Sequence, residues 1–202
     1  MNDDNYQPAP PSKARNPYTL WFVVLAFVAP VVLAYYAFYF VDISKFDNRG
    51  ELLKPMVQVS SLKLKDENNV LVPEDKLTYK WRFISFVNAS CDAICSGRLI
   101  DSRQIRKSLG KEEHRVLQVI VELAEPDEAL AQFIKTELPE AVVLKADAAD
   151  IAAIMPTPSG SSGNDIYIQD PLGNILMRFK LEQPVVDIQH DIKKLLKVSQ
   201  IG

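Results

Sequence analysis

An uncharged stretch of 24 residues, from Tyr18 to Val41, constrains this chain more than any other feature. Crossing about 30 Å of hydrocarbon takes about 20 apolar residues at about 1.5 Å each, so the stretch is long enough to span a membrane once with some tilt. Backbone groups in lipid must be hydrogen-bonded internally, which predicts a helix, with a bend allowed at Pro30. Trp21 near one end and three tyrosines near the other suit the two membrane interfaces.

A cleaved signal peptide is the competing interpretation of the same stretch. Its apolar core would be about 7–15 residues long, with a small-x-small cleavage site after it. Here the stretch is longer and ends in Tyr and Phe, which favours an uncleaved anchor, and the absence of a polar face disfavours a buried core helix. We therefore expect a disordered tail over residues 1–16, a transmembrane anchor over 17–42, a charged tether over 43–49 and a folded domain over 50–202.

Charge and cysteine content exclude several classes of protein. The net charge of −3 comes from 23 Lys and Arg against 26 Asp and Glu. Binding nucleic acid needs a concentrated basic surface, so we expect no nucleic-acid partner. Two cysteines are too few for a disulfide-dense secreted scaffold or for a four-cysteine zinc site. Basic residues lie on both sides of the apolar stretch, so the positive-inside rule does not decide its orientation.

Behind the anchor, strand and helix patterns alternate without an internal repeat. We predict strands at Met56–Val59, Leu62–Leu64, Trp81–Val87, Val116–Val121, Ala141–Leu144, Ile166–Gln169 and Ile175–Lys180, the last two joined by a hairpin turn. We predict helices from about Cys91, capped by Ser90 or Asn88 and stopped by Gly110, from Pro126 to Leu138, from Asp147 to Met155 and from Val185 to Val198. This order predicts an α/β domain of about 150 residues.

Cys91 and Cys95 form a Cys-x-x-x-Cys where a buried strand leads into a helix. Free amides and the helix dipole at that end stabilise an anion, which favours the thiolate form of Cys91, although Asp92 opposes this effect. A separation of four residues puts both sulfurs on one helical face, one turn apart. The pair can close a disulfide, bind one soft metal ion such as Cu(I), or be two buried and inert cysteines.

Two segments carry a resemblance to a known family. Phe83 to Cys95 (FISFVNASCDAIC) resembles the active segment of the Sco/SenC family, thioredoxin-like and membrane-anchored proteins of cytochrome c oxidase copper-site assembly. Ile166 to Asn174 (IYIQDPLGN) is similar to the family's Tyr-Leu-x-Asp-Pro-x-Gly hairpin. The resemblance covers roughly residues 50–198. It implies an α/β, thioredoxin-like domain behind one N-terminal transmembrane helix.

The chain departs from the family's pattern at the copper ligands. In the family a His about five residues before the hairpin Tyr completes the copper site, and here that position is Ser162. The family's Pro after the first Cys is Asp92. The two histidines of the chain, His114 and His190, are expected on the surface. The chain therefore resembles a divergent member of the Sco/SenC family that lacks the family's copper-ligand His.

The resemblance also implies a location and a role. It implies a bacterial inner-membrane protein with one span and its C-terminal domain in the periplasm, accessory to cytochrome c oxidase assembly. The implied partner is an oxidase subunit or another assembly factor. Cys91 and Cys95 are the predicted catalytic pair of a thiol-disulfide oxidoreductase, with Cys91 attacking and Cys95 resolving, or the ligands of a transient Cu(I) ion. The alternative is a non-catalytic assembly or scaffolding protein with a degenerate Sco-like site.

Overall fold

The computed structural model describes residues 17–40, 48–155 and 164–201. The chain forms two separate units, residues 1–46 and 47–202. The tail predicted over residues 1–16 and most of the predicted tether lie outside the described residues.

The first unit contains α1 (Pro17–Phe40), which continues as a helix through Pro30. Its segment Leu20–Tyr39 carries no Asp, Glu, Lys or Arg, and none of it is buried. Within the described ranges, α1 is the one helix long and apolar enough to cross a membrane. By its length and composition, α1 is therefore a candidate membrane span.

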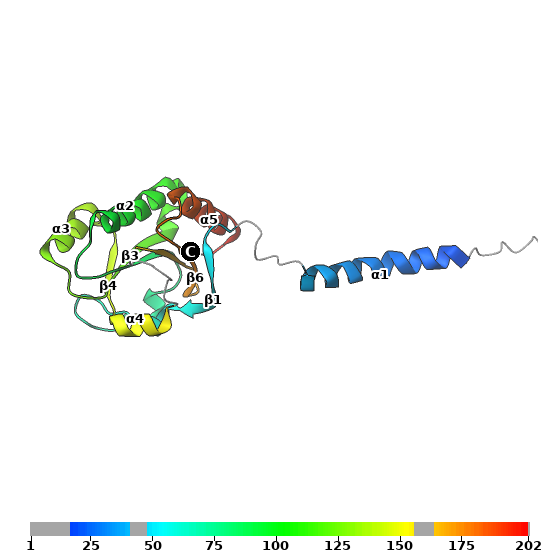
Figure 1. Ribbon diagram of the computed structural model, residues 1–202, viewed down its shortest axis with the longest axis horizontal. Coiled ribbons are helices and arrows are strands. Elements are labelled where there is room, and N and C mark those ends of the chain that lie inside the picture. Colours follow the sequence, from blue (N-terminus) through cyan, green and yellow to red (C-terminus); the bar gives the residue numbers. More distant parts are fainter. Residues whose placement is uncertain (1–16, 41–47, 156–163, 202) are drawn as a thin grey trace, which may run out of the picture. The chain divides into compact units, whose positions relative to one another are not determined.

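The second unit is built on one mixed sheet of six strands in the order β1-β6-β5-β2-β3-β4 (Figure 1). The strands are β1 (Glu51–Gln58), β2 (Trp81–Val87), β3 (Val116–Glu122), β4 (Val142–Lys145), β5 (Ile166–Gln169) and β6 (Asn174–Phe179). Strands β2, β3 and β4 are parallel, whereas β5 runs antiparallel to β2, and β6 runs antiparallel to both β5 and β1. The carboxyl ends of β2, β3 and β4 therefore share one edge of the sheet.

Helices cover both faces of this sheet (Figure 1). The helices are α2 (Ala93–Ser108), α3 (Glu128–Glu137), α4 (Ala148–Ile154) and α5 (Val185–Val198), and short 3₁₀ helices lie at η2 (Val59–Leu62), η3 (Glu74–Lys76) and η4 (Gly110–Arg115). α2, α3 and α5 pack on one face and α4 on the other. Gly110 follows α2 with φ of 60°, the left-handed conformation expected of a glycine that stops a helix. The α/β prediction is confirmed.

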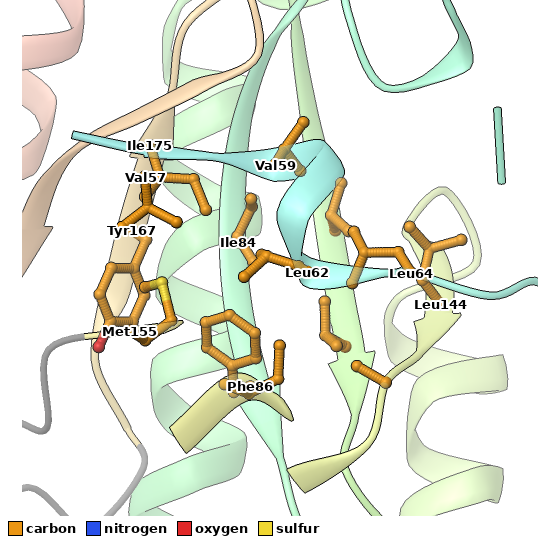
Figure 2. Packing of buried hydrophobic residues seen from close by; sticks show 14 of the residues in the cluster. Val57, Val59, Leu62, Leu64, Ile84, Phe86, Leu144, Met155, Tyr167 and Ile175 are labelled. Atoms are coloured by element: carbon orange, nitrogen blue, oxygen red, sulfur yellow. The ribbon is translucent and has the colours of Figure 1, made fainter. Parts of the chain in front are cut away.

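The central strand β2 is buried on both sides, because successive side chains of a strand point to opposite faces. Ile84 and Phe86 pack into the cluster under α4, with Val59 and Leu62 among its members (Figure 2). Phe83 packs on the opposite face, in the cluster under α2 and α5. The segment that leads to Cys91 is thus a strand held firmly in the middle of the core.

The predicted strand Leu62–Leu64 is wrong. β1 ends at Gln58, and the chain turns through η2 before Lys63 takes a left-handed conformation with φ of 49°. Val59 and Leu62 are three residues apart, the spacing that a 3₁₀ helix places on one side, and both are buried. A short apolar pattern did not distinguish this turn from a strand.

Candidate functional site

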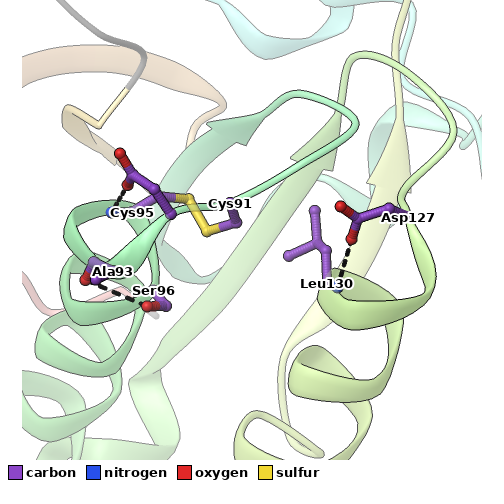
Figure 3. Close-up of a disulfide and its surroundings, with 7 residues drawn as sticks. Cys91, Ala93, Cys95, Ser96, Asp127 and Leu130 are labelled. Atoms are coloured by element: carbon purple, nitrogen blue, oxygen red, sulfur yellow. Dashed lines mark hydrogen bonds between the residues drawn. A yellow bond between two sulfur atoms is a disulfide. The ribbon is translucent and has the colours of Figure 1, made fainter.

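Cys91 and Cys95 are joined by a disulfide, with their Cα atoms 5.3 Å apart. The bond lies where β2 leads into α2 (Figure 3). Cys91 is half-buried, whereas Cys95 in the first turn of α2 is only 9% exposed. The structure therefore brings the two predicted site residues together, and Cys91 is the more exposed of the two.

The residue that caps α2 is Asp92, not Ser90 or Asn88. Its carboxylate accepts a hydrogen bond from the backbone N–H of Cys95 at 2.8 Å, satisfying one of the free amides at the start of the helix. Cys91 consequently lies just outside the helix, and the prediction that both cysteines share a helical face was wrong. The disulfide is still possible because the turn before the cap brings the two Cα atoms within bonding range.

The start of α3 lies beside the disulfide. α3 is capped by Asp127, whose carboxylate accepts a hydrogen bond from the backbone N–H of Leu130 at 2.7 Å, so the prediction that Pro126 opens this helix was wrong. The backbone N–H of Asp127 donates to the carbonyl of Ala89 at 2.7 Å. Leu130 and the half-buried Cys91 belong to the same hydrophobic cluster, and Figure 3 shows Cys91 on the side of the disulfide that faces α3.

A buried carboxyl group lies at the end of the neighbouring strand. The parallel register of β2 and β3 pairs Val87 with Glu122, which is 7% exposed. Burial raises the pKa of the Glu122 carboxyl, and the nearby Lys145 partly offsets this effect. The sequence prediction assigned Glu122 no role. The available signal was a carboxylate that closes a strand of mostly apolar residues.

Three further charged residues are buried together where β5 begins: Arg98, Asp165 and Arg178. Arg98, on α2 three residues after Cys95, donates from Nη2 to the carbonyl of Lys180 at 2.8 Å. Arg178 Nε lies 3.8 Å from Asp165 Oδ2. Burial raises the pKa of the Asp165 carboxyl and lowers the pKa of the Arg98 guanidinium. Sequence reasoning missed this cluster, because its members come from three separate elements.

The described residues contain no group of three or more His, Cys, Asp or Glu side chains able to hold a metal ion. His114 is exposed in η4, with Nδ1 2.8 Å from the carbonyl oxygen of Lys111. It precedes β3, so it lies at the end of the sheet opposite Cys91. Ser162, at the position of the family's copper-ligand His, lies outside the described residues. Within the part that is described, the soft donors at the site are the two sulfurs.

One protein family matches most of the folded domain. The family described as "transmembrane-like, thioredoxin-like, C-terminal domain" matches residues 81–199, which is more than half of the chain. This chain belongs to that family. The matched region runs from β2 to the end of α5 and contains both cysteines. Among curated proteins, none matches the chain in sequence.

Solved structures with the same fold include several Sco proteins. Arabidopsis thaliana ScoI with copper bound is 17% identical, with a TM-score of 0.53, over 74% of this chain and 99% of that one. Apo Sco1 from Thermus thermophilus is 14% identical, with a TM-score of 0.56, over 75% and 99% of the two chains. Yeast Sco1 is 14% identical, with a TM-score of 0.52, over 71% and 94%. The thioredoxin-like, Sco-like fold implied by the resemblance is confirmed.

Proposed function

We propose that this protein is a membrane-anchored thiol-disulfide exchange factor accessory to cytochrome c oxidase assembly. The observation that carries the proposal is the Cys91–Cys95 disulfide at the start of α2, with one cysteine half-exposed and the other buried. Exchange requires one sulfur that a partner can reach and a second sulfur close enough to it to resolve the mixed disulfide. BsSco, described as a member of the Sco family of cytochrome c oxidase assembly proteins, has the same fold, which supports the assembly role.

Exchange begins from the reduced pair. The Cys91 thiolate attacks one sulfur of a partner disulfide and displaces the other partner sulfur as a thiolate, which forms a mixed disulfide. The Cys95 thiolate then attacks the Cys91 sulfur, closes the intramolecular disulfide and displaces the second partner sulfur. Two electrons and two protons pass from this protein to the partner. A partner dithiol reduces the Cys91–Cys95 disulfide by the same steps in reverse.

Transient handling of Cu(I) as cargo is the second candidate function. Two thiolates are soft donors that suit Cu(I), and a Cα separation of 5.3 Å lets both sulfurs reach one ion after reduction. Arabidopsis thaliana ScoI, which has the same fold, has copper bound. Because the described residues add no acidic or histidine cluster, the proposed ligands are Cys91 and Cys95 alone.

We further propose a bitopic arrangement in a bacterial inner membrane. Residues 17–42 would form the anchor, with the tail at 1–16, the tether at 43–49 and the thioredoxin-like domain at 50–202 in the periplasm. Disulfides persist in oxidising compartments, which supports the periplasmic side for Cys91 and Cys95. Confinement next to a membrane partner raises the effective concentration without new contacts.

The test uses the full chain in its own membrane. Cys95→Ser should trap a mixed disulfide between Cys91 and the partner, seen as a reducible high-mass band on a non-reducing gel, and Cys91→Ser should give none. The Cys91→Ser/Cys95→Ser double variant should lose oxidase assembly. Full assembly in the double variant would exclude both exchange and copper handling and would leave scaffolding.

Anaerobic titration of the reduced full chain with Cu(I), against a competing chelator, tests the copper function. One bound equivalent that disappears in Cys91→Ser supports copper handling. No binding within the range of the chelator would exclude it and leave the exchange function in place.

A further inference from the structure

Three helices begin where a parallel strand ends, and an aspartate caps each of them. Asp92 caps α2, Asp127 caps α3 and Asp147 caps α4. Each carboxylate accepts a hydrogen bond from a backbone N–H in the first turn of its own helix, at 2.8, 2.7 and 2.8 Å respectively. Because β2, β3 and β4 are parallel, the three caps lie along the edge of the sheet that carries the disulfide.

Asp92 directly contacts the backbone of the reactive pair. It stands next to Cys91 in sequence, and its carboxylate is hydrogen-bonded to the backbone N–H of Cys95. A bare helix N-terminus attracts negative charge, but here a carboxylate already occupies it. A reagent that approaches Cys91 therefore meets a fixed negative charge.

Asp127 adds a second negative charge from α3. The backbone N–H of Asp127 donates a hydrogen bond to the carbonyl of Ala89, two residues before Cys91. Figure 3 shows Asp127 across from the disulfide. Among the described residues, two basic side chains of neighbouring elements have other partners. Arg98 is buried and donates to the carbonyl of Lys180, and Lys145 lies 3.4 Å from a carboxylate oxygen of Glu125. Asp92 and Asp127 are both exposed, so these two side chains add negative charge to the surface near Cys91.

We propose that Asp92, assisted by Asp127, makes the Cys91–Cys95 pair selective for partners whose disulfide is flanked by Lys or Arg. Rate constants for encounter rise when the charges of two surfaces are complementary, and like charges close to the reacting atoms slow the encounter. A cationic partner gains attraction at the point where the Cys91 thiolate must approach its disulfide, and an anionic partner is repelled. The inference rests on the exchange function proposed above and names the substrate class of that same site.

Small disulfides of opposite charge test this selectivity. The reduced full chain, in a neutral detergent, is reacted with cystamine, which is cationic, and with oxidised glutathione, which is anionic. The ratio of the two second-order rate constants is measured at low salt for the wild type and for Asp92→Asn. Asn is an equally good helix cap, so the variant keeps the hydrogen bond and loses only the charge.

We expect Asp92→Asn to lower the cystamine-to-glutathione ratio by about threefold to tenfold, the effect of one charge a few ångström from the reacting sulfur in water. Comparing ratios between proteins cancels the intrinsic reactivity of each disulfide. Asp127→Asn should lower the ratio less. Asp147→Asn is the matched control, because it makes the same change at the cap of α4 on the other face of the sheet, and it should leave the ratio unchanged. At 1 M salt, charges are screened within about 3 Å, so the cystamine-to-glutathione ratios of wild type and Asp92→Asn should differ less than at low salt.

Two outcomes would overturn this inference alone, and a third would overturn it together with the exchange function. An equal ratio in wild type and Asp92→Asn would mean that the carboxylate does not select by charge, although exchange itself would stand. An equal fall in Asp92→Asn and Asp147→Asn would mean that the effect comes from helix caps in general or from the total charge. If the reduced wild type reacted with neither disulfide, the proposed exchange function would fail, and the selectivity with it.

Discussion

Reducing the Cys91–Cys95 disulfide should leave the domain folded and cost about 2 kcal/mol of stability. The two cysteines are separated by 4 positions, so the bond closes a very short loop. Loop closure of this length removes about 6–7 cal/mol/K of entropy from the unfolded chain, which is about 2 kcal/mol at 25 °C. Folded domains are typically stable by about 5–15 kcal/mol, so a cooperative native state should survive reduction.

The assay compares unfolding of the full chain in detergent with and without a thiol reductant, followed by the fluorescence of the buried Trp81. For a domain of this size, about 2 kcal/mol corresponds to a fall in Tm of about 4–8 °C. Leu99→Ala supplies a scale, because Leu99 is buried in the cluster that contains Cys95 and its truncation should cost about 2–5 kcal/mol. The Cys91→Ser/Cys95→Ser variant is the control and should not respond to the reductant.

Loss of the cooperative transition on reduction would refute this reasoning. So would a fall in Tm well beyond that of Leu99→Ala. Either result would identify the disulfide as a structural bond that the fold needs, and a pair that must open and close during exchange cannot have that role.

Three further predictions concern stability. Gly50→Ala should destabilise the domain by about 1–3 kcal/mol, because the added Cβ would lie 2.5 Å from the buried ring of Phe179. Gly97→Ala in α2 should stabilise the domain by about 0.5–1 kcal/mol, because nothing lies within 4 Å of the added Cβ. Urea unfolding that gave the reverse order of stability would contradict both predictions. Arg82→Lys should lower the unfolding free energy by about 2 kcal/mol or more in the same assay. The reason is that the buried guanidinium donates to four backbone carbonyls, which one ammonium group cannot reach together. An unchanged urea midpoint would contradict a stabilising role of these hydrogen bonds. The pKa of Glu122 is raised in the folded state, so folding favours the protonated carboxyl. This preference contributes fully to the free energy of unfolding below the unfolded-state pKa of about 4.3, and the contribution is lost as pH rises through the higher folded-state pKa. Glu122→Gln should therefore raise the urea midpoint at pH 7 more than at pH 4, and an equal effect at both pH values would show that the Glu122 carboxyl is not destabilised by burial.

Local patterns in the sequence predicted the elements whose formation depends on nearby residues. The uncharged run predicted α1, the apolar and β-branched run Trp81–Val87 predicted β2, and the helical spacing at Val185–Val198 predicted α5 with the bounds that the structure shows. These patterns are reliable because a period of 2 or 3.6 residues, or the length of an apolar stretch, is a property of consecutive residues. The Cys-x-x-x-Cys, placed after a buried strand, located the candidate site for the same reason.

The first residues of α2 show where such patterns stop being sufficient. Asn88, Ser90 and Asp92 are all good capping residues, and the sequence alone does not rank them at neighbouring positions. The structure selects Asp92, because the segment after β2 continues past Ala89, whose carbonyl accepts the backbone N–H of Asp127, before the helix begins. That choice moves Cys91 outside the helix and puts a carboxylate beside the disulfide.

The sequence by itself determined the long apolar helix α1, the order of most strands and helices and the position of the cysteine pair. Only the tertiary structure decided which groups surround that pair. The parallel register of β2 with β3 brings Glu122 to the same edge of the sheet, and the packing of α3 brings Asp127 next to Ala89. Arg98 and Asp165 are likewise buried in one cluster although they are far apart in sequence. These neighbours depend on strand register and helix packing, which are set by contacts between distant segments, whereas a sequence pattern records only the preferences of adjacent residues.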